Sequence, residues 1–132
     1  MIVDTSALIA IALGEPETIR LLKRLHEAPT RRISIASVLE ACLVLVGRLG
    51  EGGRSELEAL LRRLDVDVVP VDLEQGRIAQ EAAVRFGRGR HGAALNYGDC
   101  FSYALAVAED DELLCVGDDF SQTDVRIAYI DG

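Results

Sequence analysis

The sequence lacks the features that mark membrane, secreted and disulfide-rich proteins. No apolar run approaches the roughly 20 residues that cross a membrane, and no basic region precedes a long apolar stretch at the N-terminus. Cys42, Cys100 and Cys115 lie far apart in apolar segments, which favours reduced, buried thiols over a disulfide framework or a zinc site. We therefore expect a cytoplasmic protein without a membrane span or a secretory signal.

Lysine and histidine are also scarce, and their positions argue against two classes of enzyme. Lys23 is the only lysine, whereas phosphorylation receiver domains use a lysine late in the chain. A phosphatase with an Asp-x-Asp motif would need an acid at Ser6. Neither His26 nor His91 falls at the end of a predicted strand, so the chain offers no serine or cysteine paired with histidine as a nucleophile.

The charge of the chain is unevenly distributed. The 132 residues, 49% of them hydrophobic, predict a single domain over 1–132 that buries roughly two-thirds of its unfolded surface. The net charge of −8 arises after residue 98, where Arg126 is the only base. A basic cluster (Arg85, Arg88 and Arg90) precedes Asp99 in the sequence. Local patches of positive charge, rather than the net charge of the protein, determine whether it binds a phosphate backbone. A second basic cluster, within 20–32, is equally explained as a solvated helix face.

Apolar runs alternate with helical patterns along the chain. We predict strands at 1–4, 32–35, 66–71 and 113–116, with a fifth at 126–130. We predict helices at 7–13, 16–28, 37–49, 57–64, 72–86 and 97–108. This alternation indicates a three-layer α/β fold with a central, mostly parallel sheet of four or five strands flanked by helices. The 37–49 helix is apolar on nearly every face, so we expect it to be buried centrally.

Acidic residues follow the predicted strands. Asp4 closes the first strand, Asp118 and Asp119 follow the fourth, and Glu40 and Asp99 are predicted in the first turn of a helix after a short loop. Open α/β sheets bind ligands beyond the carboxyl ends of their strands. Clustered carboxylates repel one another and persist only if a cation or protons neutralise them. Because hard oxygen ligands suit Mg²⁺ or Mn²⁺, the pattern predicts a metal site.

Each of these motifs also has a purely structural explanation. Ser37-x-x-Glu40 and Asn96-x-x-Asp99 both fit the helix capping box, and Asp4 can be simply an acid at a strand end. A residue can both cap a helix and bind a metal. Three unrelated structural roles for Asp4, Glu40 and Asp99 at one edge of the sheet are also less probable than one shared site. The glycines of the 87–92 segment match a dinucleotide fingerprint, but they follow a helix rather than a strand, so we assign no nucleotide site there.

Four segments together resemble the PIN-domain ribonucleases, and among them the VapC toxins of bacterial type II toxin–antitoxin pairs. The segments are Ile2–Leu8, Ser37-x-x-Glu40, Leu95–Ala104 and Gly117–Asp124, and they span almost the whole chain. The resemblance implies a PIN-like fold and Mg²⁺-dependent cleavage of RNA, with Mn²⁺ as a possible substitute. It also implies a homodimer and a VapB-like antitoxin as partner.

The resemblance places the family's catalytic acids on Asp4, Glu40, Asp99 and Asp119. Many PIN domains carry the fourth acid slightly earlier, where this chain has Gly117, so Asp118 is the alternative. Adjacent residues of an extended segment point to opposite sides, so at most one of the two should face the site. The resemblance of Gly117-x-Asp119-Phe120 to the family's Gly-x-Asp-Phe pattern favours Asp119. Asp118 would then face solvent.

On this reading the chemistry needs no protein nucleophile. Asp4 and Asp99 would hold the metal, Glu40 and Asp119 would complete a second site or orient a water, and Arg88 and Arg90 would bind the RNA. A catalytically silent PIN-like module that binds RNA or protein is the alternative from another class, and a nuclease acting on DNA is a closer chemical one.

Overall fold

The structure is a computed structural model, and it describes residues 1–89 and 92–130. Within these residues, four parallel strands form one sheet in the order β3-β2-β1-β4. The strands are β1 (Ile2–Val3), β2 (Arg32–Ser34), β3 (Asp67–Val69) and β4 (Leu113–Leu114). The helices are α1 (Thr5–Ala12), α2 (Thr18–Glu27), α3 (Ile35–Leu49), α4 (Gly52–Arg63), α5 (Leu73–Phe86) and α6 (Tyr97–Glu109). The predicted three-layer α/β class is confirmed.

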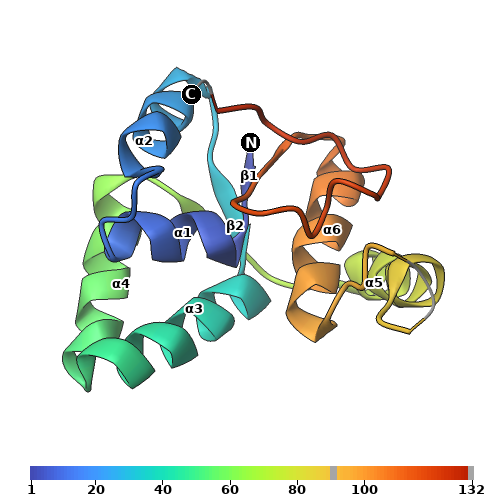
Figure 1. The fold of residues 1–132 in the computed structure, drawn as a ribbon, viewed down its shortest axis with the longest axis horizontal. Helices are drawn as coiled ribbons and strands as arrows, with labels where there is room; N and C mark the ends of the chain where they lie inside the picture. Colours follow the sequence, from blue (N-terminus) through green and yellow to red (C-terminus); the bar gives the residue numbers. More distant parts are fainter. Residues whose placement is uncertain (90–91, 131–132) are drawn as a thin grey trace.

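Helices cover both faces of the sheet, with α1 to α4 on one side and α5 and α6 on the other (Figure 1). Neighbouring strand residues point to opposite faces. Val3 and Leu114 therefore belong to the core beneath α1 to α4, whereas Ile2 and Leu113 belong to the core beneath α5 and α6. Burial on both faces explains why the strands are apolar runs rather than alternating ones.

Side-chain caps start four of the described helices, α1, α3, α5 and α6. Asp4 caps α1, and Asp72 caps α5 through a hydrogen bond from the Gln75 N–H (2.8 Å). The predicted start of α3 at Ser37 is wrong: Ser34 caps the helix, and Ser37 lies inside it. Glu40 therefore lies in the second turn of α3, not the first, and takes no part in a capping box.

Helix α3 also contradicts the prediction that it would be buried centrally. Its buried residues are Ser37, Ala41 and Leu45, which share one face at a spacing of four. Its exposed apolar residues are Ile35, Leu39, Leu43, Val44, Val46 and Leu49. Leu43 is 67% exposed, so the described residues leave uncovered the apolar outer face that suggested a core helix.

The predicted fifth strand, at 126–130, is reduced to a single parallel bridge between Leu113 and Ile127. Leu113 N–H donates to Arg126 O (2.8 Å), and Ala128 N–H donates to Leu113 O (2.9 Å). Because β4 is only two residues long, it offers no further ladder positions to the C-terminal segment.

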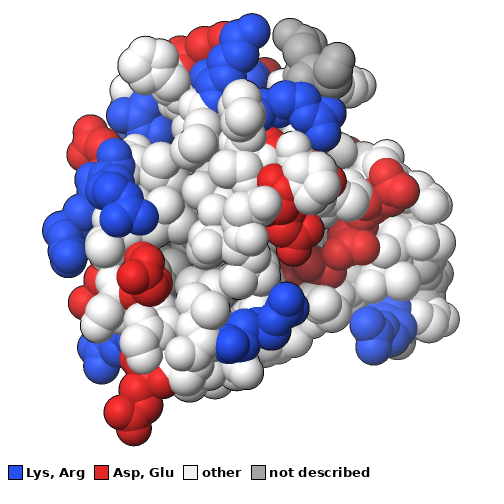
Figure 2. Space-filling view, turned by 60° about the vertical axis from the view of Figure 1, so that its left-hand side comes forward, with Lys and Arg blue, Asp and Glu red and all other residues white. Residues whose placement is uncertain are grey.

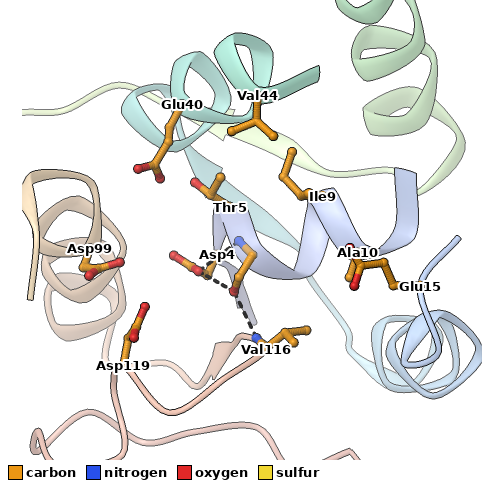
Figure 3. A pocket seen from close by; sticks show the side chains of 11 residues that line it. Asp4, Thr5, Ile9, Ala10, Glu15, Glu40, Val44, Asp99, Val116 and Asp119 are labelled. Carbon is orange, nitrogen blue, oxygen red and sulfur yellow. Dashed lines mark hydrogen bonds between the residues drawn. The ribbon is translucent and has the colours of Figure 1, made fainter. Parts of the chain in front are cut away.

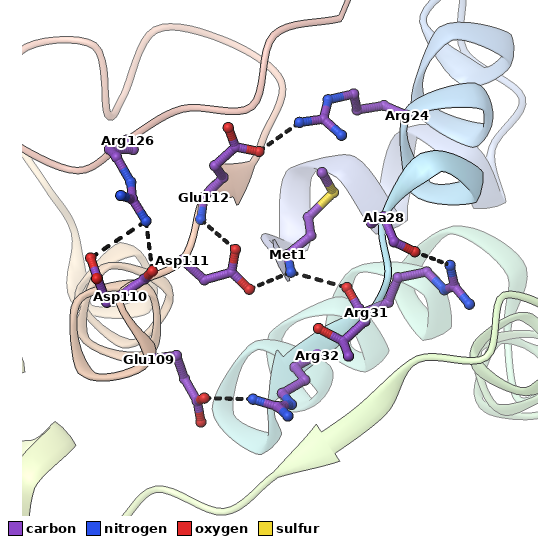
Figure 4. Close-up of polar contacts among 11 residues, drawn as sticks. Met1, Arg24, Ala28, Arg31, Arg32, Glu109, Asp110, Asp111, Glu112 and Arg126 are labelled. Carbon is purple, nitrogen blue, oxygen red and sulfur yellow. Dashed lines mark hydrogen bonds and ion pairs between the residues drawn. The ribbon is translucent and has the colours of Figure 1, made fainter.

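An ion-pair network lies around the start of β1 and β4, at the amino ends of the strands (Figure 4). The acidic run at 109–112 is paired there residue by residue. The pairs are Glu109 with Arg32 (2.5 Å), Asp110 with Arg126 (3.4 Å), Asp111 with the N-terminal ammonium, and Glu112 with Arg24 (2.6 Å). Arg24 and Arg32, which belong to the second basic cluster, therefore have a structural role.

None of the described helices has the length and apolar character to cross a membrane.

Candidate metal and catalytic site

Four predicted acids meet in one pocket of about 370 Å³ at the carboxyl ends of the strands. Asp4 comes from the end of β1, Glu40 from α3, Asp99 from α6 and Asp119 from the loop after β4, and their side chains point toward one another (Figure 3). The space-filling view shows acidic side chains gathered in a hollow that is bordered by uncharged surface (Figure 2). The crossover connections between the parallel strands thus bring together residues that are up to 115 positions apart in sequence.

Asp4 is held in place by hydroxyl and amide donors. Its Oδ2 accepts hydrogen bonds from the Ser6 N–H (3.0 Å) and the Ser6 hydroxyl (2.6 Å), and its Oδ1 accepts one from the Ser102 hydroxyl (2.5 Å). Ser102 in turn lies 3.1 Å from the hydroxyl of Ser37. Sequence analysis assigned no role to Ser102. The signal was present, because Ser102 follows Asp99 by three residues and so shares its helix face.

Asp99 takes part in the capping box that its spacing predicted. The Asp99 N–H donates to Asn96 Oδ1 (2.9 Å), and the Asn96 N–H donates to Asp99 Oδ2 (3.0 Å). Burial raises the pKa of Asp99 to about 6, opposed by the Asn96 hydrogen bond and reinforced by the carboxylates of Asp4, Asp119 and Glu40. Asp99 is therefore both a cap and a carboxylate whose charge needs a cation.

Glu40 reaches the pocket by resting against the first turn of α6. A Cβ atom at Gly98 would lie 2.1 Å from Glu40 Oε2 and 2.6 Å from its carboxyl carbon. Any side chain at position 98 would therefore displace the Glu40 carboxylate. Gly98 belongs to the motif that carried the family resemblance, but its role was not predicted, because it depends on a contact between two helices.

Asp119 lines the pocket, whereas Asp118 is exposed outside it and Phe120 is buried. This arrangement matches the orientation predicted for the two neighbours, whereas the catalytic role of Asp119 stays a prediction. The cause of the orientation differs from the expected one, because the segment is not extended. Gly117 has φ +93°, and the Ser121 N–H donates to Asp118 O (3.2 Å), so a turn aims Asp119 at the other acids.

The donor set of the pocket fits a hard divalent cation. Its polar lining is made of carboxylates and hydroxyls, with no nitrogen or sulfur side chain among the described residues. Among the described residues, no group of three or more Asp, Glu, His or Cys side chains is arranged to hold a metal ion. Mg²⁺ needs fewer protein ligands than that, because it usually binds to one or two carboxylates and keeps several waters.

The cysteines lie outside this chemistry. All three are free, with Cys100 and Cys115 buried and Cys42 half-buried. Burial raises the pKa of Cys115 to about 12, with a further contribution from the nearby Asp4 and Asp119 charges. A thiol with so high a pKa is neutral at physiological pH and is a poor nucleophile or metal ligand.

Of the two predicted RNA-binding arginines, the structure describes Arg88, which does not line the acidic pocket. Arg88 is exposed and lines a separate groove between α5 and α6, and Arg90 lies outside the described residues. Arg85, the third member of that cluster, pairs with Asp124 (3.3 Å) and packs over the Phe86 ring.

Comparisons with known proteins agree with this arrangement. The PIN domain family matches residues 1–126. Ribonuclease VapC of Mycolicibacterium smegmatis is 47% identical over 98% of this chain and 100% of its own. Ribonuclease VapC30 of Mycobacterium tuberculosis is 45% identical over 95% of both chains.

Solved structures show the same fold. The crystal structure of VapC20 of Mycobacterium tuberculosis, a sarcin-ricin loop cleaving toxin, has a TM-score of 0.76 at 20% identity and covers 94% of this chain and 95% of that one. A toxin-antitoxin complex from Klebsiella pneumoniae has a TM-score of 0.73 at 18% identity and covers 96% and 95%. The chain therefore belongs to the PIN-domain family and, within it, groups with the VapC ribonucleases.

Proposed function

We propose that this protein is the toxin of a VapBC-type toxin–antitoxin pair and cleaves RNA through a water activated by Mg²⁺. The observation that carries the proposal is the pocket in which Asp4, Glu40, Asp99 and Asp119 meet, and in which the pKa of Asp99 is raised to about 6 by burial and by the other acids. The names of the relatives support RNA as the substrate, since several at 39–47% identity are ribonucleases.

Asp4 and Asp99 are the residues proposed to hold the cation. Both are fixed by hydrogen bonds from neighbouring groups, which orients their free oxygen lone pairs before a ligand arrives. A Mg²⁺ ion held there would polarise a phosphodiester oxygen and lower the pKa of a bound water.

Glu40 and Asp119 are proposed to act on the attacking water. Both carboxylates point into the pocket, and neither accepts a hydrogen bond from another described residue. Each can therefore accept a hydrogen bond from the water and orient it for in-line attack. Since no histidine lines the pocket among the described residues, Thr5 and Ser6 lack the histidine base that commonly activates a nucleophilic hydroxyl.

Two protein partners are part of the proposal: a VapB-like antitoxin and a second copy of this chain. The neighbouring structures include a toxin-antitoxin complex and VapBC2 of Rickettsia felis, which supports the antitoxin. The pocket has four carboxylates at one end, and Ile9 and Val44 add apolar surface beside Glu15 at the other, so a partner segment with basic and apolar side chains suits it. The exposed apolar face of α3 supports a homodimer.

Incubation of the purified protein with single-stranded and structured RNAs tests this function. We expect cleavage with Mg²⁺, its loss with EDTA, and its return when Mg²⁺ or Mn²⁺ is added in excess. RNA binding without cleavage in the presence of either metal would contradict the proposal and would favour the catalytically silent module. A DNA substrate of the same sequence, tested in parallel, separates a ribonuclease from a nuclease that acts on DNA.

A further inference from the structure

A second cavity, of about 450 Å³, lies between α5 and α6 and shares no lining residue with the acidic pocket. Its α5 side is made of small residues, among them Gly76, Ala79 and Ala83. Its α6 side carries Tyr97 and Phe101. The cavity is therefore a groove with an aromatic wall.

Tyr97 is unusual for an aromatic residue because it is 82% exposed. Its ring packs edge-on against Phe101, with the ring centres 4.9 Å apart and the planes at 79°, which holds it at the groove. Its hydroxyl makes no hydrogen bond within the described part of the chain. Exposed aromatic rings on nucleic-acid-binding proteins serve as platforms on which unpaired bases stack.

The polar groups of the groove suit a base attached to a phosphate. Arg88 lies at the groove, is exposed, and its guanidinium makes no ion pair with a described residue, in contrast to Arg85, which pairs with Asp124. Asn96 and Gln80 also line the groove and are exposed. Asn96 uses its carbonyl oxygen to cap α6, so its amide N–H groups remain as donors for the edge of a base.

The groove and the acidic pocket lie on two sides of the first turn of α6. Asn96 of the groove and Asp99 of the pocket are hydrogen-bonded to each other, and Cys100 of the groove follows Asp99 directly. An RNA strand with one phosphate at the carboxylates can therefore place a neighbouring nucleotide in the groove. Arg88 adds the positive charge that an acidic pocket lacks for a phosphate backbone.

We infer that this groove binds one unpaired nucleobase next to the scissile phosphodiester, with Tyr97 as the stacking platform and Arg88 as a phosphate contact. The inference rests on the proposed function, since it assigns a base subsite to the same substrate. It implies that the protein acts on single-stranded or looped RNA, because a base within a duplex cannot enter the groove.

A binding experiment with abasic RNAs tests the subsite. A short single-stranded RNA is prepared as a series in which each variant lacks one base, and its affinity is measured by fluorescence anisotropy in EDTA, which stops metal-dependent cleavage. For the wild-type protein we expect one position, next to the cleavage site mapped with Mg²⁺, at which loss of the base weakens binding about tenfold. Tyr97→Ala should weaken binding of the intact RNA to the same extent and abolish the response at that position.

Three further variants make the result specific. Tyr97→Phe keeps the ring and should bind as the wild type does. Ala83→Leu fills the groove from α5 and should reproduce the loss without removing an aromatic residue. Tyr129→Ala removes an equally exposed tyrosine (84%) that lies outside the groove, and it should have no effect.

An abasic response that is the same in Tyr97→Ala and the wild type would overturn the subsite. So would a change of oligomeric mass in Tyr97→Ala with an unchanged abasic response, since the groove would then be a surface for protein. Cleavage by the wild type with Mg²⁺ is scored separately. Its absence contradicts the proposed ribonuclease, whereas the anisotropy data judge the groove on their own.

Discussion

Asp4 and Asp99 differ from Glu40 and Asp119 in how they are held. Serine hydroxyls and backbone amides fix the first two, whereas no hydrogen bond from a described residue fixes the other two. Fixed carboxylates lose little further freedom when they bind an ion, and mobile ones can follow a water during the reaction. This difference is the structural basis for assigning the first pair to the metal and the second pair to the water.

The roles of Asp119 and Asp118 can be separated by substitution. Asp119→Asn should lower the single-turnover rate of RNA cleavage by about 10- to 100-fold, as expected for a group that orients a ligand through hydrogen bonds. Asp118→Asn should be nearly silent, because Asp118 is exposed outside the pocket. Both rates are measured at saturating Mg²⁺, and a larger loss from Asp118→Asn would show that the fourth acid is the other neighbour.

Gly98→Ala tests the placement of Glu40. The new Cβ would occupy the position of the Glu40 carboxylate and push it away, so we expect cleavage to fall by up to about 100-fold. Stability should stay level or rise by up to about 1 kcal/mol, because alanine favours a helix over glycine. Gly47→Ala, in α3 with no atom near its Cβ, should give the stability gain alone. Thermal unfolding and cleavage rates are measured for both variants. Full activity of Gly98→Ala would show that cleavage does not depend on the position of the Glu40 carboxylate.

At the scale of elements, helix α3 positions the site with one face and leaves the other without a partner. Its buried face packs Ala41 and Leu45 into the core and thereby holds Glu40 over the pocket. Its outer apolar residues are exposed. Exposed apolar rows of this kind usually mark a protein contact, which is why we assign this face to the proposed homodimer.

Leu39→Glu combined with Leu43→Glu tests this assignment. Because both side chains are exposed in the single chain, the double variant should fold normally but no longer self-associate. Sedimentation equilibrium should show the mass of one chain where the wild type shows two. Ile19→Glu, which places the same charge at an 80% exposed position on α2, should keep the wild-type mass. An unchanged mass in the double variant would mean that α3 is not the dimer surface.

The elements show where sequence reasoning succeeds and where it stops. Asp4 and Asp99 were predicted because a strand end and a capping motif are local signals, and parallel topology then brings them together. The burial of α3 was predicted wrongly because a helix that is apolar all round looks the same whether its outer face meets the core or another protein. Ser102 and Gly98 could not be assigned roles because their contacts, with Asp4 and Glu40, join separate elements.

At the scale of the whole molecule, the negative charge is divided between two ends of the sheet. The acidic run at 109–112 is neutralised by arginines and the N-terminal ammonium at the amino ends of the strands (Figure 4). The carboxylates at the other end have no such partners among the described residues, and they gather in a hollow (Figure 2). In the proposed function the RNA would approach a negative site, and the proposed cation and arginines would offset that repulsion.

Replacing Arg88 and Arg90 together with alanine tests the contribution of the arginines. RNA affinity should fall, and the slope of log K against log salt should become shallower by about 0.7 for each lost phosphate contact. Arg54→Ala with Arg62→Ala removes the same charge from exposed positions on α4, and it should leave the slope unchanged. The slopes are measured by anisotropy titrations over a range of salt concentrations. Identical slopes for the wild type and the Arg88–Arg90 variant would show that these arginines are solvated surface residues that do not contact RNA phosphates.

The central claim is that Asp4 and Asp99 hold a catalytic cation. The raised pKa of Asp99 also predicts how the stability of the metal-free protein depends on pH. The folded pKa of Asp99, about 6, lies above its ordinary value of 3.8. The metal-free fold therefore binds a proton that the unfolded chain has already lost, so its stability falls as pH rises from about 4 through 6. Asp99→Asn removes this penalty and keeps an oxygen for the cap, so at pH 7 it should be at least as stable as the wild type without metal.

Single-turnover RNA cleavage by Asp99→Asn at saturating Mg²⁺, beside Asp4→Asn and the wild type, tests this claim most directly. Both variants should be folded by circular dichroism and should show no cleavage above background, because each has lost one of the two fixed carboxylates. Cleavage by either folded variant at the wild-type rate would contradict the metal site and the mechanism built on it.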